Sequence, residues 1–171
     1  MEASDGMRIS NINEIVQHTM NLFDHIRQGD LKSVQLFLQN HPEAANRPDE
    51  RGFTPLVLAT YTGQKEIAAF LIDNGASVNA QDMIGNSALM GVSFKGDLEA
   101  AKMLIAKGAD LDIQNSNKTT ALIYAATYGQ VEIVKLLLHH GADKALKDVN
   151  NHTAFDVARA KQNDEIMKLL I

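Results

Sequence analysis

The chain has 171 residues, of which 45% are hydrophobic, a fraction typical of a globular protein and too high for a disordered one. Its formal net charge is −5, and its 16 Lys and Arg residues form no basic run of the kind that binds phosphates, so we expect no nucleic-acid partner. It contains no cysteine, which excludes disulfides, a thiol nucleophile and a Cys-based zinc site.

The N-terminal residues predict a tail followed by a first pair of helices. No apolar segment there has signal-peptide length, and no apolar run reaches the roughly 18 residues of a membrane span, so we predict a cytoplasmic protein without a membrane partner. Residues 1–10 are predicted to be a flexible tail and residues 11–48 an N-terminal helical capping repeat. The apolar residues that keep helical spacing there are Ile12, Ile15, Val16, Leu22, Phe23 and Ile26.

The rest of the chain repeats with a fixed period. Segments with the same pattern begin 33 residues apart, at Asp49, Asp82, Asn115 and Asp148. They predict repeats at 49–81, 82–114 and 115–147, and a C-terminal capping repeat at 148–171. A period of this length indicates that small helical units stack to bury a shared core within one domain.

Each repeat predicts two short helices. The first helix follows a Ser or Thr suited to cap its N-terminus, namely Thr54, Ser87, Thr120 or Thr153. Glycines suited to end it are Gly63, Gly96 and Gly129. The second helix begins with an acid that complements its dipole, namely Glu66, Glu99, Glu132 or Glu165, and ends in three repeats at Gly75, Gly108 or Gly141.

The period, the "TPL" start at Thr54–Leu56 and the "GAD" endings resemble the ankyrin repeat, from about Asn21 to Ile171. The resemblance implies an all-α solenoid of helix–turn–helix pairs joined by short hairpin loops, with about five repeats including both caps. The histidine that usually follows "TPL" is replaced by Val57, Met90, Ile123 and Asp156, so we expect looser hairpins.

Two further positions depart from the pattern. Lys118 stands where other hairpins have glycine or asparagine, and since lysine disfavours positive φ, we expect Asn117 to adopt that conformation or the turn to be reshaped. Gly91 lies inside a first helix, at a cost of about 1 kcal/mol. We expect it either to make room for Tyr124 one repeat later or to be a soft spot.

The pattern gives no catalytic, cofactor or metal site. The acidic residues recur at turn starts and helix N-termini, and the glycines do not cluster as a phosphate loop requires. His139 and His140 have no third histidine nearby in sequence, and we interpret them as a solvated helix end.

By the resemblance, a partner protein is expected to bind the concave face, formed by the hairpin tips and the outer face of the first helices. Exposed aromatic and apolar side chains on that face favour interaction, and charged residues would set orientation. The predicted partner-binding residues are Arg51, Phe53, Tyr61, Met83, Ile84, Phe94, Lys95, Tyr128 and Lys161.

We therefore predict a monomeric, non-catalytic protein-interaction module, acting as a stand-alone adaptor or inhibitor. The alternatives are a fragment of a larger scaffold, which the initial Met and the C-terminal cap disfavour, and a hydrolytic enzyme that would need His25, His41 or a carboxylate pair to converge. Asn79 resembles the hairpin asparagine that some ankyrin proteins offer to a hydroxylase, but asparagine there also satisfies turn backbone.

Overall fold

The computed structural model describes residues 22–171, which belong to two compact units, Met1–Ala76 and Ser77–Ile171. The predicted tail and the start of the predicted N-terminal capping repeat, residues 1–21, lie outside the described residues. Every named element is helical, and in the part of the chain that is described, β pairing is limited to one isolated bridge between Gln81 and Ser87. The predicted all-α class is confirmed.

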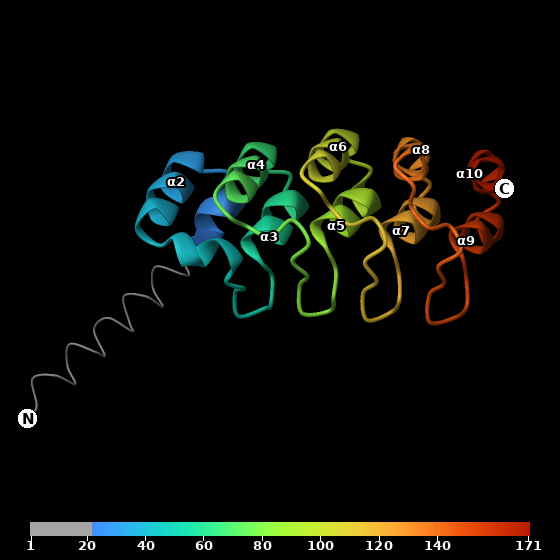
Figure 1. Cartoon of the computed structure of the whole chain (residues 1–171), viewed down its shortest axis with the longest axis horizontal. Helices are drawn as coiled ribbons and strands as arrows, with labels where there is room; N and C mark the ends of the chain where they lie inside the picture. The colour runs from blue at the N-terminus through green and yellow to red at the C-terminus, as the bar shows by residue number, and fades with distance from the viewer. Residues whose placement is uncertain (1–21) are drawn as a thin grey trace, which may run out of the picture. The chain divides into compact units, whose positions relative to one another are not determined.

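Within the described part of unit 1, residues 22–76, short helices pack against one another (Figure 1). After helical residues 22–28 come α2 (Leu31–Asn40), the 3-10 helix η1 (Pro42–Asn46), α3 (Pro55–Tyr61) and α4 (Lys65–Asp73). Helix α4 packs against α2 and α3, and α3 also contacts η1. The largest side chains that this packing buries completely are Leu22, Ile26, Leu56, Ile67 and Leu71.

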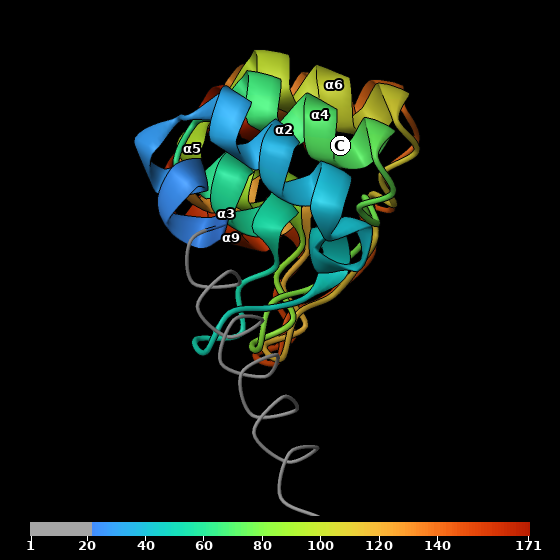
Figure 2. The ribbon, with the colours of Figure 1, turned by 90° about the vertical axis from the view of Figure 1, so that its left-hand side faces the viewer.

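Unit 2, Ser77–Ile171, arranges three helix pairs in two rows. The pairs are α5 (Ala88–Lys95) with α6 (Leu98–Ala106), α7 (Ala121–Thr127) with α8 (Val131–His139), and α9 (Ala154–Ala160) with α10 (Asp164–Leu170). The first helices α5, α7 and α9 pack side by side, as do α6, α8 and α10. Figure 2 shows α5 and α9 on one side of this unit and α6 on the other. Large buried side chains between the rows include Leu89, Leu104, Leu122, Ile133 and Leu137.

The capping residues, glycines and acids predicted at the helix ends occupy the expected positions. Thr54, Ser87, Thr120 and Thr153 each cap a first helix by accepting a hydrogen bond from the N–H three residues later. The glycines predicted to end helices have positive φ, for example 76° at Gly96, where a side chain would be strained. The acids predicted for the second helices lie in their first turns.

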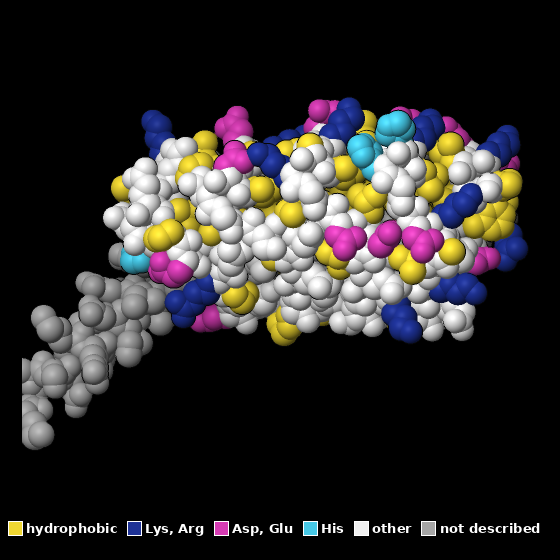
Figure 3. Space-filling model, viewed as in Figure 1, with side chains coloured by type: hydrophobic (Ala, Val, Ile, Leu, Met, Phe, Trp, Pro, Cys, Tyr) yellow, Lys and Arg dark blue, Asp and Glu magenta, His cyan; other side chains and the backbone are white. Residues whose placement is uncertain are grey.

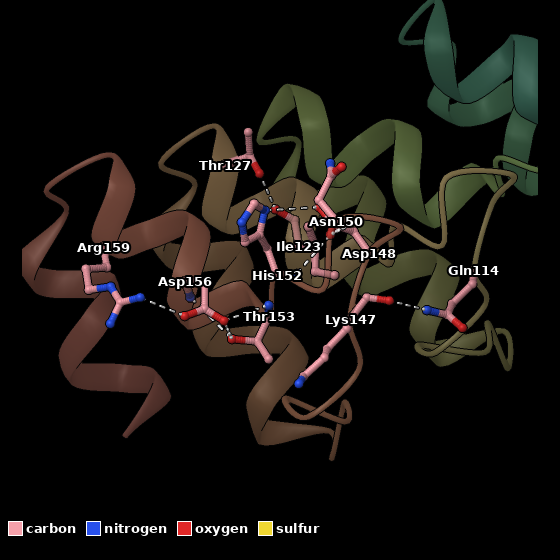
Figure 4. Close-up of polar contacts among 10 residues, drawn as sticks. All are labelled: Gln114, Ile123, Thr127, Lys147, Asp148, Asn150, His152, Thr153, Asp156 and Arg159. Atoms are coloured by element: carbon pink, nitrogen blue, oxygen red, sulfur yellow. Dashed lines mark hydrogen bonds and ion pairs between the residues drawn. The ribbon is translucent and has the colours of Figure 1, made fainter.

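A hairpin loop precedes each of α3, α5, α7 and α9 and projects away from the helices (Figure 1). An Asp or Asn opens each loop and accepts two backbone N–H groups with one side-chain oxygen; Asp148 accepts from Asn150 at 2.8 Å and from His152 at 2.9 Å (Figure 4). Asp49, Asp82 and Asn115 do the same. This side chain therefore closes the loop whatever residue occupies its tip.

Lys118 itself adopts the left-handed conformation, with φ of 54°, and the turn keeps the hydrogen bonds of the other hairpins. Both expectations, that Asn117 would adopt this conformation or that the turn would be reshaped, were therefore wrong. The Asn115 side chain holds the N–H groups on both sides of Lys118, those of Asn117 and Thr119, at 2.9 and 3.0 Å. In addition, the Gln114 side chain donates to the Lys118 carbonyl at 2.7 Å. These bonds impose the standard loop geometry on a lysine, and the local backbone strain is the consequence.

Hydrogen bonds link consecutive hairpins of unit 2, although the histidine that the resemblance leads us to expect is absent. The N–H of Ser116 donates to Ile84 O and the N–H of Val149 donates to Asn117 O, both at 3.0 Å. Gln114 links its own loop to the next one by donating to Lys147 O at 3.1 Å (Figure 4). These bonds join neighbouring hairpins, while the expected looseness of the hairpins stays a prediction.

Gly91 does not make room for Tyr124, contrary to one of our two expectations. Beyond its two chain neighbours and the backbone of its own helix, a Cβ atom built on Gly91 would have no heavy atom within 4 Å. Close packing therefore does not require glycine at this position of α5.

Candidate functional site

The exposed aromatic side chains of unit 2 meet at the C-terminal ends of α5 and α7. The rings of Phe94 and Tyr128 are in edge-to-face contact, with centroids 4.5 Å apart and planes at 81°. Their side chains are 38% and 51% exposed. Gln130 joins the same helix ends by donating to Phe94 O at 3.2 Å. Two predicted partner-binding residues from different repeats therefore form one aromatic surface.

Tyr124 extends this surface, and the sequence analysis did not include it. Its ring stacks on Tyr128 with centroids 6.4 Å apart. Its hydroxyl accepts from Asn115 Nδ2 at 3.2 Å and lies 3.5 Å from Asn86 Oδ1. Burial raises the pKa of the Tyr124 phenol, although the bond from Asn115 acts in the opposite direction. We call Phe94, Tyr124 and Tyr128 the aromatic cluster.

The hairpin tip before α5 adds apolar surface in the same unit. Met83 and Ile84 are 70% and 58% exposed. The Ile84 backbone is fixed, because its N–H donates to Asp82 at 3.0 Å and its carbonyl accepts from Ser116. Two large apolar side chains are therefore held in solvent on an ordered loop.

Two lysines occupy the same helix phase as Tyr128. Lys95, Tyr128 and Lys161 stand 33 residues apart at the ends of α5, α7 and α9, which pack side by side. All three side chains are exposed. An aromatic ring is thus placed between two positive charges along one row.

The remaining predicted partner-binding residues belong to unit 1. Tyr61 ends α3 and is 52% exposed, and Arg51 is exposed on the hairpin before that helix. Phe53 is half-buried, and its N–H donates to Asp49. Unit 1 therefore also has an exposed aromatic ring, at the C-terminal end of α3.

Acidic side chains gather elsewhere on unit 2. Figure 3 shows a row of them across the middle of one face. In the turns after α6 and α8, the side-chain oxygens of Asp110, Asp112 and Asp143 each accept a hydrogen bond from a backbone N–H group; Asp112, for example, accepts from the N–H of Asp143 at 2.9 Å. Their carboxylates satisfy turn backbone, as the sequence analysis expected of the recurrent acids.

The paired histidines and the hairpin asparagine singled out in the sequence make local contacts within the fold. His139 and His140 contact each other edge to face at 5.2 Å, and no group of three metal-binding side chains occurs within residues 22–171. Asn79 accepts from the N–H of Asp110 at 2.8 Å, which agrees with its interpretation as a turn residue. None of the described helices is long and apolar enough to span a membrane.

Comparison with known families accounts for the repeat pattern. A family model described as ankyrin repeats in three copies matches residues 11–82 and 88–171, and a second, described as ankyrin repeats in many copies, matches residues 61–105. No curated protein is significantly similar to the chain. Ankyrin repeats are generally protein–protein interaction modules and typically lack catalytic activity. The family models cover most of the sequence, and the chain belongs to the ankyrin repeat family.

Proposed function

We propose that this chain is a non-catalytic binding module that acts as a monomeric adaptor or inhibitor and holds a partner protein against its hairpin tips and first helices. The contact between the exposed rings of Phe94 and Tyr128 carries the proposal. Exposed aromatic residues that gather on a surface are typical of interaction sites, and tyrosine is enriched among residues that dominate binding energy.

The apolar residues would supply most of the affinity. Met83 and Ile84 keep much of their surface in water, and covering it would contribute about 25 cal/mol for each Å² of apolar area. Because their loop is held by hydrogen bonds, little conformational entropy would be lost on binding. In unit 1, Phe53 and Tyr61 offer the corresponding side chains.

The charged residues would orient the partner. Lys95 and Lys161 border Tyr128 in unit 2, and Arg51 lies on a hairpin of unit 1. Exposed charges at the edge of an interface alter association rates more than they alter affinity.

The test is the triple substitution Tyr61→Ala, Phe94→Ala and Tyr128→Ala. Partners would first be identified by co-purification from a native lysate, and their affinity for purified variants would then be measured by calorimetry. We expect the triple variant to lose binding while its helicity and unfolding midpoint stay near those of the wild type, since all three side chains are exposed.

The matched control is Leu36→Ala, which truncates an exposed apolar side chain on α2, a helix without predicted partner-binding residues. This variant should bind like the wild type. Undiminished binding by the triple variant would show that the partner uses another surface.

A further inference from the structure

An asparagine followed by glycine occurs once in the sequence, at Asn74–Gly75, where helix α4 ends. The equivalent ends of α6 and α8 have Lys107 and His140 before their glycines. Both Asn74 and Gly75 are exposed. Asparagine deamidates fastest when glycine follows it, because a residue without a side chain does not hinder attack of its backbone nitrogen on the asparagine Cγ atom.

The folded end of α4 holds both groups that would react. The N–H of Gly75, whose nitrogen is the nucleophile, donates to Ile72 O at 3.2 Å. The side-chain amide of Asn74, which contains the leaving group, donates to Phe70 O at 2.8 Å. Attack therefore requires this last helical turn to open, and helix ends are where local opening costs the least free energy.

Asn40, at the end of α2, provides an internal comparison. It is also exposed, and its side-chain amide donates to the carbonyl four residues earlier, Leu36 O, at 3.0 Å. The residue that follows it is His41, whose side chain hinders the attack. Asn40 and Asn74 thus share exposure and side-chain bonding, and they differ in the residue that follows.

We propose that Asn74 is a site of spontaneous deamidation, which proceeds when the end of α4 opens. The Gly75 nitrogen forms a bond to Asn74 Cγ, and its proton passes through water to Nδ2. The Cγ–Nδ2 bond then breaks, which releases ammonia and leaves a five-membered succinimide. Water adds to either succinimide carbonyl, and the ring opens to aspartate or isoaspartate. Water is the co-reactant, and nothing is oxidised or reduced.

Either product weakens the end of α4. A carboxylate cannot donate to Phe70 O, and it adds negative charge at the negative end of the helix dipole. Isoaspartate also adds one CH2 group to the backbone before Gly75, which shifts the Ala76 N–H away from Leu71 O, its partner in the Schellman motif at 2.9 Å. Asn46, which donates to Gly75 O at 2.7 Å, loses the position of its acceptor.

The experiment incubates the full chain at pH 8 and follows each asparagine by peptide mapping with mass spectrometry, which also separates isoaspartate from aspartate. We expect Asn74 to convert about tenfold or more faster than Asn40. In urea that unfolds the chain, conversion of Asn74 should accelerate about threefold or more, because the last turn no longer has to open. Asn74→Gln should suppress the reaction, because glutamine would have to form a six-membered ring.

Hydrogen exchange measures the consequence for the helix end. In chains that contain isoaspartate, exchange of the Ala76 amide should accelerate about tenfold or more, whereas the Ala109 amide, which makes the same bond to Leu104 O after α6, should exchange as before. Conversion of Asn40 as fast as Asn74, no acceleration in urea, or unaltered exchange at Ala76 would overturn the inference. None of these results bears on partner binding, so the proposed function would stand.

Discussion

At the scale of single residues, Lys118 shows how a side chain elsewhere can decide backbone conformation. Lysine alone gives no reason to expect a φ of 54°. Asn115 imposes that conformation through its bonds to Asn117 and Thr119, and it does so with the same atoms that close the other hairpins. The identity of the loop-opening residue is therefore a better predictor of the turn than the residue at the strained position.

Replacing Lys118 by glycine should stabilise the protein. Relief of the left-handed strain outweighs the extra freedom of glycine in the unfolded chain, and we expect the free energy of unfolding to rise by about 0.5–1 kcal/mol. The measurement is urea denaturation followed by circular dichroism. Asn117→Gly is the control, because that residue has no positive φ, and it should destabilise. A loss of stability in Lys118→Gly would mean that the lysine side chain makes compensating contacts.

Tyr124 is the residue of the candidate site that the sequence analysis missed. Its helix position is usually assigned to packing between repeats, and its exposure is only intermediate. The available signal was the glycine at position 91, one period earlier, which marks this helix position as a departure from the repeat pattern. Recognising that signal needs the helices' spacing, which a single sequence does not supply.

At the scale of elements, helix ends were the most predictable feature. Thr54, Ser87 and Thr120 cap helices because a side-chain oxygen three residues before an orphan N–H can reach it in only one local geometry. The bonds between hairpins were less predictable. They depend on backbone groups such as Ser116 N and Ile84 O, whose partners are set by how neighbouring repeats pack.

Helix α9 has an additional N-terminal feature with a pH dependence. Thr153 and Asp156 form a reciprocal capping box, in which the Asp156 carboxylate accepts from the Thr153 N–H at 3.0 Å and its hydroxyl at 2.8 Å (Figure 4). These bonds from Thr153 lower the pKa of Asp156, with Arg159 and His152 adding to the effect. A carboxylate with a lowered pKa stabilises the fold above its ordinary pKa and ceases to do so as pH falls through its folded-state value.

Asp156→Asn should therefore destabilise the protein at pH 7 and matter progressively less as the pH falls below about 4. Urea midpoints of wild type and variant, measured between pH 7 and pH 2.5, would show the two curves converging. The control is Glu50→Gln, which neutralises an exposed hairpin carboxylate and should give a smaller difference at pH 7. A constant offset at every pH would contradict the role assigned to the charge.

At the scale of the whole molecule, equivalent glutamine side chains form the same hydrogen bonds between successive repeats. Gln114 donates to the Lys118 carbonyl within its own repeat and to the Lys147 carbonyl of the following segment. Gln81, one period earlier, likewise donates to Gly85 and Gln114 carbonyls. Stability in such arrays is the sum of the repeats and their interfaces, so a single interfacial side chain has a measurable effect.

Gln114→Ala should lower the free energy of unfolding by about 1–2 kcal/mol, because two carbonyls lose their donor. Hydrogen exchange of the Val149 amide, which donates to Asn117 O across the same pair of hairpins, should accelerate. Gln39→Ala, on the exposed surface of α2, should change neither the free energy of unfolding nor the exchange rate of the Val149 amide. Unchanged exchange at Val149 would mean that the backbone bond alone holds the hairpins together.

The short sequence span of these links also has a kinetic consequence. Gln114 and Lys147 are 33 residues apart, and Asn115 and Asn86 are 29 apart, so each interface closes a loop of about one period. Closing a loop of that length has a modest entropic cost, and the contact order of such a chain stays low. Folding can begin wherever two adjacent repeats first meet and then spread along the chain, without waiting for its ends to find each other.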